Sequence, residues 1–404
     1  MSADDKKDDA STPPRLWSDG LPRWLGARVF NRIMGALAFL IAICALIAAG
    51  GALPSSHPLP LLTCVAMSFP AVAVHEVGHA LAARLHGMRV LEIHVGFLNI
   101  IPLRKGLRWR LASPPKGVLG LVNAIPDPER SLKPAMLWLM VGGPLANLVM
   151  ALMCLPFAIW GSSPWSEYVT AFLLINVAGF LINVLPFNGR HHASDGWQWL
   201  QWRCVCSEGQ RELSVLKLMS LSVWGVTADR MPEALLRQIE SLGHGGALLV
   251  AWVRLKASQN LGEWVVVEEV ERETTKMLGQ ISREERSGLK GILAWLQVES
   301  AFSQAVVQRD VRALLALPLG REMRWRAPHL EYRFAALACA LAGDLPACEA
   351  MLVRAQSAAR RSQELALDES EARLAEHIRA LAHSVVAARQ SGVPATARSS
   401  ARLA

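Results

Sequence analysis

The sequence lacks the features by which several classes of protein are identified. Its 404 residues contain no ATP-binding loop, dinucleotide-binding glycine pattern or nucleic-acid-binding motif, so we expect no nucleic-acid partner. Its 7 cysteines are odd in number and scattered, which argues against a disulfide framework. Cys204 and Cys206 resemble half of a metal site, but no second CxC or CxxC pair completes it, and we interpret them as ordinary thiols.

Charged residues are also scarce. They make up 19% of the chain against 52% hydrophobic residues, with a formal net charge of +8 and a mean hydropathy of +0.26. This composition is too apolar for an ordinary cytosolic protein and predicts an integral membrane protein. A helix needs about 20 mostly apolar residues to cross a bilayer. Four windows meet that requirement: residues 33–53, 59–85, 136–160 and 168–187.

The first window ends in small residues, as a cleavable secretory signal does. A polar leader of 32 residues with Asp4, Asp5, Asp8 and Asp9 is a poor signal, however, so we expect a retained span. Basic residues precede this window and fill the loop between the second and third windows, whereas the connections after the first and third contain no Lys or Arg. The positive-inside rule therefore predicts cytoplasmic N- and C-termini in a multi-pass protein of the cell membrane, the inner membrane in a bacterium.

Three ionisable side chains interrupt the second window in the sequence HEVGH: His75, Glu76 and His79. Residues four apart lie on one face of a helix, so both histidines can bind one metal ion with Glu76 beside them. Zinc held in this way lowers the pKa of a bound water to about 7, and a neighbouring carboxylate can take its proton. HExxH strings also arise by chance, and a histidine on an apolar face is often simply packed. A carboxylate inside a span costs about 2.5–3.5 kcal/mol, which favours a functional site.

The depth of the motif separates two kinds of zinc protease. At 1.5 Å per residue, His79 and His75 lie roughly 7 and 14 Å inward from Arg84, the predicted cytoplasmic anchor of the helix. The predicted site is therefore inside the membrane but nearer the cytoplasm. A soluble-type zinc protease with a membrane anchor would carry its HExxH outside the apolar window.

A third ligand is expected after the fourth window, where Asn183 and Pro186 are followed by the pair Asp195 and Gly196. Pro186 ends or kinks the helix and leaves irregular backbone, which a membrane tolerates only where it lines a cavity in the protein. A hydrolase needs such a cavity.

With these motifs the chain resembles the site-2 protease family of intramembrane zinc metalloproteases. The resemblance rests on HEVGH at 75–79, GGPLAN at 142–147, and Asn183-x-x-Pro186 followed by Asp195-Gly196, and it covers roughly the first half of the chain. It implies zinc on His75, His79 and Asp195, Glu76 as general base, Asn183 near the substrate carbonyl or the bound water, and Asn147 polar toward the site, where it would bind substrate. Gly142, Gly143 and Pro144 would allow close helix packing, although small residues at helix contacts are ordinary in membranes.

The spacing from Asn183 to Asp195 is longer than in the commonest family pattern, and the additional residues include His191 and His192. We interpret this pair as basic residues at the cytoplasmic edge of the membrane. The alternative is that one of them replaces Asp195 as a zinc ligand.

Residues 89–128 contain short segments with partial alternation and Gly or Pro breaks, which predicts a small β-hairpin insertion. One interpretation is a cytoplasmic cap. The other is an edge strand that pairs with the substrate, because a protease must extend the helix that it cuts.

Residues 197–390 contain no further span, and their apolar residues recur at helical spacing with charged faces, which predicts a soluble, all-helical cytoplasmic domain. Tetratricopeptide-like hairpins and a plain helical bundle are both compatible with this pattern, and a protein partner is conceivable for either. Residues 391–404, small and basic, are predicted to be a disordered tail.

The predicted protein is thus an all-α polytopic membrane protein with about four transmembrane helices, a small β-hairpin insertion and a C-terminal soluble all-α domain. Its predicted parts are a cytoplasmic segment at 1–32, a protease core at 33–196, the helical domain at 197–390 and the tail. The predicted function is a zinc endopeptidase that cuts a transmembrane or membrane-associated protein near the cytoplasmic face, in regulated intramembrane proteolysis. The alternative is a catalytically inactive membrane scaffold whose helical domain binds partner proteins.

Overall fold

The computed structural model describes residues 27–113, 118–188, 193–204 and 213–391. The chain forms two compact units. The first contains Met1–Ile101 and Leu107–Glu208, and the second contains Pro102–Gly106 and Gly209–Ala404. The predicted fold class is confirmed: the described residues are mostly helical, with one small sheet.

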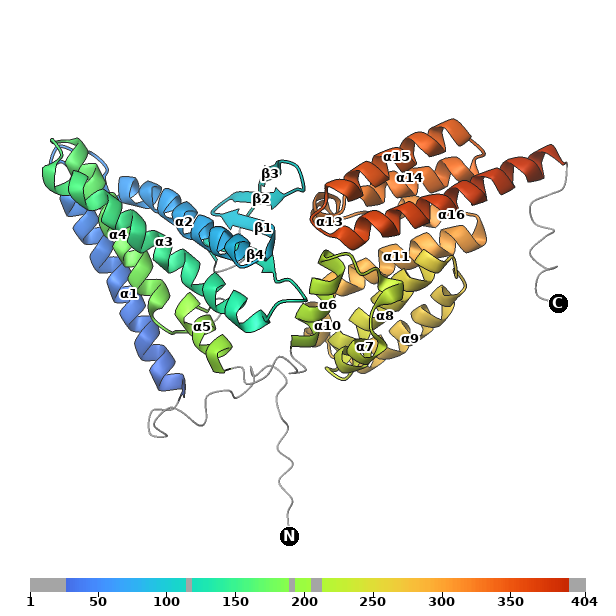
Figure 1. Ribbon diagram of the computed structural model, residues 1–404, viewed down its shortest axis with the longest axis horizontal. Helices are drawn as coiled ribbons and strands as arrows, with labels where there is room; N and C mark the ends of the chain where they lie inside the picture. The colour runs from blue at the N-terminus through green and yellow to red at the C-terminus, as the bar shows by residue number, and fades with distance from the viewer. Residues whose placement is uncertain (1–26, 114–117, 189–192, 205–212, 392–404) are drawn as a thin grey trace, which may run out of the picture. The chain divides into compact units, whose positions relative to one another are not determined.

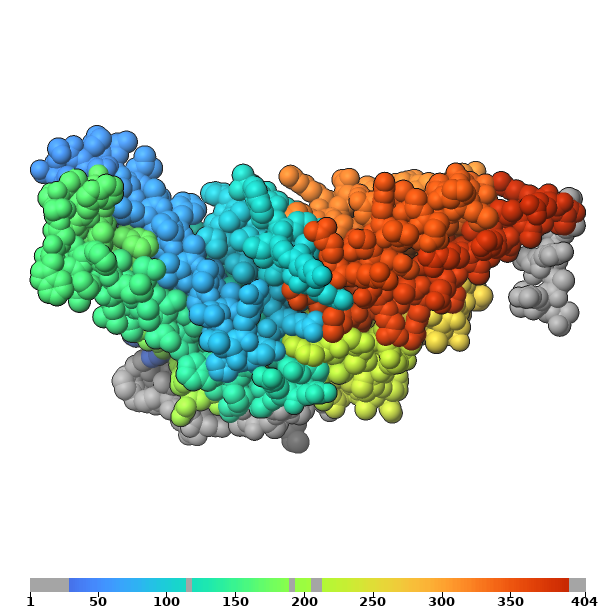
Figure 2. Space-filling model, turned by 45° about the horizontal axis from the view of Figure 1, so that its top comes forward, coloured from blue at the N-terminus to red at the C-terminus, as the bar shows by residue number. Residues whose placement is uncertain are grey.

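Four helices of the first unit are long and apolar enough to cross a membrane. They are α1 (Ala27–Ala52), α2 (Pro60–Leu85), α3 (Leu132–Trp160) and α4 (Trp165–Val184) (Figure 1). These helices correspond to the four predicted windows, which confirms a polytopic membrane protein. At one end of the unit, the start of α2 and the start of α4 lie side by side (Figures 1 and 2), and the rings of His57 and Tyr168 meet there with centroids 5.8 Å apart.

Glycine allows α2 and α3 to approach closely. A methyl group added to Gly78 would lie 2.3 Å from the carbonyl oxygen of Gly142 and 2.4 Å from Cβ of Ala146. A methyl group on Gly142 would in turn lie 2.6 Å from Cβ of Ala82. Backbones that approach this closely are held by van der Waals contact, which is the main attraction between helices in lipid.

The insertion between α2 and α3 is a four-stranded antiparallel sheet with the strand order β3-β2-β1-β4. Its strands are β1 (Arg89–Val95), β2 (Leu98–Pro102), β3 (Leu107–Leu111) and β4 (Gly120–Ile125). In the register, Val95 of β1 is opposite Leu98 of β2 on one side and Gly120 of β4 on the other.

The sheet lies along α2 rather than beyond its end. β1 begins just after the last residue of α2 and runs back along the helix, so that the β1–β2 turn reaches Phe69. This turn contains Gly96, whose φ of +54° is unfavourable for any residue with a side chain, and a methyl group there would lie 2.5 Å from the Phe69 ring. The adjacent Phe97 stacks on Phe69 with ring centroids 6.4 Å apart. Because Phe69 precedes His75 by six residues, the sheet passes the HEVGH motif along the helix.

The second unit is helical in the described residues of Gly209–Ala404. Its helices are α6 (Ser214–Val223), α7 (Glu233–Glu240), α8 (His244–Leu261), α9 (Val266–Gln280), α10 (Arg283–Gly288), α11 (Lys290–Gln308), α12 (Arg312–Ala316), α13 (Arg321–Arg326), α14 (His329–Leu341), α15 (Leu345–Arg361) and α16 (Leu365–Gln390), with a 3-10 turn, η2, at Ala228–Arg230. Its main core contains Phe302, Leu337 and Leu374, all fully buried.

A network of charged side chains is buried in this helical unit. The Arg333 guanidinium of α14 binds both carboxylate oxygens of Glu299, at 2.9 and 2.8 Å, and Glu371 at 2.9 Å. Lys256 of α8 lies 3.2 Å from Glu299, and His329 lies 3.9 Å from Glu371. Arg333 is only 1% exposed, so pairing is what makes its burial tolerable. The network connects α8, α11, α14 and α16.

Candidate metal centre

Two histidines of α2 and one aspartate of a later helix converge in the first unit. His75 and His79 lie one turn apart on α2, and Asp195 is the first residue of α5 (Asp195–Cys204). Oδ2 of Asp195 lies 3.0 Å from Nε2 of His75 and 3.3 Å from Nε2 of His79. The two Nε2 atoms are 3.1 Å apart. All three side chains are buried, and among the described residues they are the cluster of metal-ligating type.

The distances between these three atoms fit a zinc ion. Four-coordinate zinc binds nitrogen and oxygen at about 2.0–2.2 Å, which places neighbouring ligand atoms of a tetrahedron roughly 3.3 Å apart. The three separations in the protein, from 3.0 to 3.3 Å, match three edges of such a tetrahedron. Two imidazoles and one carboxylate are also the ligands of many catalytic zinc sites, in which a fourth position stays open.

The orientation of His79 is fixed by α3. Its Nδ1 lies 2.6 Å from the carbonyl oxygen of Leu139, so we assign the ring proton to Nδ1, which donates to that oxygen. Nε2 is then left with a lone pair directed toward Asp195. A histidine that binds a metal ion is commonly oriented by such a bond to its other nitrogen.

Gly143 of α3 leaves space for the ion. A methyl group added to this residue would lie 2.4 Å from Nε2 of His79 and 2.5 Å from Nε2 of His75. Any side chain at this position would therefore occupy the point where the ligands converge. The two glycines of GGPLAN thus have different tasks: Gly142 allows close packing with Gly78, and Gly143 borders the metal centre.

Glu76 lies between the metal centre and the sheet. Its carboxyl group is against β4, where a methyl group on Gly120 would lie 2.1 Å from Oε1. The residue is 4% exposed, and its Oε2 has no hydrogen-bond partner among the described residues. This oxygen is available to accept a proton. Sequence reasoning missed Gly120, because nothing in its neighbourhood marks a contact 44 residues away.

Ser194 fixes the start of α5 and with it Asp195. The side chain is fully buried, and Oγ accepts hydrogen bonds from the N–H groups of Phe187, at 3.0 Å, and Trp197, at 3.2 Å. It also donates to the carbonyl oxygen of Leu185 at 2.6 Å.

The two predicted asparagines lie on neighbouring helices. Asn147, one turn after Gly143 on α3, is 3% exposed and contacts α4, where a methyl group on Gly179 would lie 2.2 Å from its Nδ2. Its Oδ1 is buried without a hydrogen-bond partner among the described residues. Asn183 of α4 donates from Nδ2 to the carbonyl oxygen of Gly179 at 2.9 Å. His191 and His192 lie outside the described residues.

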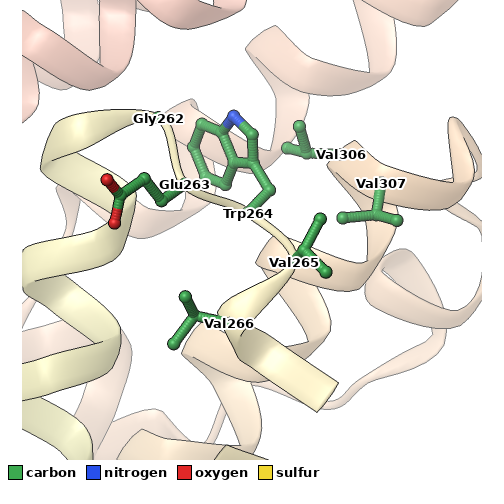
Figure 3. Close-up of a pocket in the computed structure, with 7 residues that line it drawn as sticks. All are labelled: Gly262, Glu263, Trp264, Val265, Val266, Val306 and Val307. Atoms are coloured by element: carbon green, nitrogen blue, oxygen red, sulfur yellow. The ribbon is translucent and has the colours of Figure 1, made fainter. Parts of the chain in front are cut away.

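The helical unit has a pocket that, unlike the candidate metal centre, is mainly apolar, with a volume of about 490 Å³ (Figure 3). Valines and Trp264 line it, together with Gly262 and Glu263. It holds no cluster of metal-ligating or nucleophilic side chains among the described residues, so it offers apolar surface rather than chemistry.

The sequence model of Peptidase family M50 matches residues 63–308, which is more than half of the chain. The matched segment begins after α1 and contains every residue of the metal centre. Comparisons with curated proteins and with solved structures found no match.

Proposed function

The chain belongs to peptidase family M50, the site-2 protease family of intramembrane metalloproteases, and we propose that it is a zinc endopeptidase that cuts a membrane-spanning or membrane-associated protein near the cytoplasmic face. The observation that carries this proposal is the convergence of Asp195 on His75 and His79, which lie with Glu76 on a helix of membrane-spanning length. A catalytically inactive scaffold would have no need of a complete ligand set at this depth.

We assign zinc to His75, His79 and Asp195, and the role of general base to Glu76. When bound there, zinc supplies Lewis-acid chemistry, which polarises the scissile carbonyl and lowers the pKa of a water molecule. Glu76 accepts the proton of the attacking water through its unpartnered carboxylate oxygen and then delivers it to the departing amine. The contact with Gly120 holds the carboxylate in place during both transfers.

The sheet provides a way to extend the substrate. β4 is at the edge of the sheet and begins at Gly120, against the carboxyl group of Glu76. An extended segment that pairs with the edge of β4 opposite β1, which pairs with no strand among the described residues, passes directly beside the general base. Hydrogen bonds to the strand replace those that the segment loses when its helix unwinds. We assign Asn147, whose Oδ1 has no partner among the described residues, to the binding of this segment, and Asn183 to the neighbourhood of the scissile carbonyl.

A comparison of membrane proteomes tests the proposal. Cells with the wild-type protein and cells with Glu76→Gln should differ by the accumulation of one uncleaved membrane precursor and by the loss of its released fragment, as in regulated intramembrane proteolysis. The amide keeps the shape of the carboxylate but cannot take a proton, so purified Glu76→Gln should bind zinc normally without turnover. Cleavage by this variant at a near wild-type rate would end the assignment of Glu76.

The scaffold alternative makes a different prediction for the same cells. If the helical domain acts only by binding partner proteins, Glu76→Gln should behave like the wild type, and deletion of the whole protein should not. Equal precursor levels in wild-type and Glu76→Gln cells, with altered levels after deletion, would favour the scaffold.

We propose that both termini are cytoplasmic in the cell membrane, from the distribution of basic residues around the four spans. A reporter that is active only outside the cytoplasm should give no signal when fused after Ala404 and a strong signal when inserted after Ser162, between α3 and α4. A strong signal from the first fusion would reverse the orientation and place the metal centre nearer the opposite face.

A further inference from the structure

The third metal ligand is held by a contact that none of the sequence motifs contains. Asn31, near the start of α1, forms two hydrogen bonds with the main chain of Asn188, which is 157 residues away. Its Oδ1 accepts the N–H of Asn188, and its Nδ2 donates to the carbonyl oxygen of the same residue. α1 precedes the segment that the family model matches, so this contact is added from outside that segment.

The β-bridge that Asn188 forms explains why its main-chain N–H and C=O groups need a partner such as Asn31. Asn188 and Ala193 form an antiparallel bridge, and the N–H of Ser194 donates to the carbonyl oxygen of Phe187 at 3.0 Å. In an antiparallel pair, the residues between two hydrogen-bonded positions direct their N–H and C=O groups away from the opposite strand. The main-chain groups of Asn188 therefore point outward from the bridge, where a carboxamide offers the same donor and acceptor as a peptide group.

The bridge leads directly to the metal centre. Ser194, next to Ala193, is fully buried and binds the main chain of Leu185 and Phe187 through Oγ. Asp195 follows it. A methyl group on Gly196 would lie 2.1 Å from the carbonyl oxygen of Val184, so the start of α5 rests against the end of α4. Ser194 thus holds the bridge through the main chain of Leu185 and Phe187, and Asn31 holds it through the outward-pointing main-chain groups of Asn188.

We propose that Asn31 is a positioning residue for the zinc ligand Asp195, an inference that rests on the proposed zinc site. Its side chain fixes Asn188 and, through the bridge to Ala193 and Ser194, holds the Asp195 carboxylate within reach of both histidines. α1 therefore takes part in building the metal centre although it provides no ligand.

The test uses the purified full-length protein and two alanine variants. Asn31→Ala removes both hydrogen bonds, whereas Asn188→Ala keeps them, because the bonds use only the main chain of Asn188. We expect Asn31→Ala to lower zinc affinity by about 10- to 100-fold, the usual effect of losing a residue that orients a ligand. We also expect it to change the visible absorption spectrum of the cobalt-substituted protein, which reports ligand geometry. Asn188→Ala should match the wild type in both measurements.

A double-substitution cycle separates positioning from a general loosening of α1. In an Asp195→Ala background, Asn31→Ala should cause no further loss of zinc affinity, because the ligand that it positions is gone. Equal, additive losses in both backgrounds would overturn the proposal, as would wild-type zinc affinity and an unchanged cobalt spectrum in Asn31→Ala.

A second variant, Asn31→Asp, tests the same hydrogen bonds with little change in the size of the side chain. Asn31→Asp has nearly the same size, but it loses the N–H donor and places a carboxylate against the carbonyl oxygen of Asn188. It should weaken zinc binding as well, and an unchanged affinity would contradict the inference. These results are independent of the proposed function, because a wild-type protein that bound no zinc would refute the zinc site itself, whatever Asn31 does.

Discussion

Gly143 and His79 are so close that a methyl group on the glycine would lie 2.4 Å from Nε2 of the histidine. The separation is shorter than any ordinary contact between non-bonded atoms, and the methyl group would also lie 2.5 Å from Nε2 of His75. The backbone of α3 thus forms one wall of the metal centre.

We predict that Gly143→Ala weakens zinc binding while the protein still inserts into the membrane. The methyl group would occupy the point where the ligands converge, so zinc affinity should fall at least about tenfold. Atomic absorption of the purified variant measures the bound zinc. Gly35→Ala is the matched control, because a methyl group at Gly35 of α1 meets nothing within 4 Å. Stoichiometric zinc in Gly143→Ala would mean that the ion is bound elsewhere.

We predict that Asp195, rather than His191 or His192, completes the ligand set. Loss of a direct ligand lowers metal occupancy steeply, whereas loss of a solvated neighbour does not. Asp195→Ala should therefore lose zinc and cleavage, and the double change His191→Ala with His192→Ala should keep both. The opposite pattern, with zinc and activity retained only in Asp195→Ala, would show that the ligand has been assigned to the wrong residue.

Gly120→Ala should separate catalysis from metal binding. Its methyl group would lie 2.1 Å from Oε1 of Glu76 and would displace the carboxylate, whereas Glu76 is not one of the three proposed zinc ligands. We expect a loss of turnover of about 100-fold or more, the usual contribution of a positioned general base, with unchanged zinc content. Single-turnover cleavage and metal analysis of the same sample measure the two effects. Wild-type turnover would mean that the sheet does not position Glu76.

The buried network of the helical unit predicts a stability that depends on pH. The pKa of His329 is lowered from 6.5 to about 4, mainly by burial and also by Arg333 and Lys256, against the opposing effect of Glu371 and Glu299. Between these two pH values the unfolded chain binds a proton that the folded protein does not, so stability falls as the pH falls from 6.5 toward 4. The full loss is at most roughly 3 kcal/mol.

Denaturant unfolding of the full-length protein at pH 7 and pH 5, followed by tryptophan fluorescence, measures this effect. Replacement of His329 by Gln should reduce the difference between the two pH values, whereas His383→Gln, at an exposed position on α16, should leave it unchanged. The same difference in all three proteins would assign the pH dependence to other groups.

Local patterns made much of the fold and part of the site predictable. Four long apolar windows are sufficient to predict four helices, because the need to satisfy backbone groups in lipid leaves few alternatives. His75 and His79 are one helical turn apart, so helix geometry alone brings them together. Asp195 was a candidate third ligand because it follows the fourth apolar window, and the family resemblance assigned it that role. The separation of 120 positions between His75 and Asp195 contains no local signal of the contact itself.

Contacts between distant parts of the chain account for what sequence reasoning missed. The predicted β insertion is present, but the sequence did not show that it has four strands or that β1 and β4 pack on α2. The amphipathic pattern of the second unit placed charged residues on solvent-facing surfaces, yet Arg333 and Glu371 are buried. Periodicity cannot reveal such pairs, because each residue becomes tolerable inside the protein only through partners on other helices.

The distance along the chain between His75 and Asp195 also determines how long after His75 the ribosome adds Asp195. A ribosome adds about 5–20 residues per second, so the aspartate emerges roughly 6 to 24 s after the histidine. During this interval the nascent chain carries the histidines and Glu76 in α2 but not Asp195, the proposed third ligand. With zinc bound as we propose, a chain that is still being synthesised cannot hydrolyse its neighbours at the insertion machinery, and it acquires this capacity only after α4 has been made.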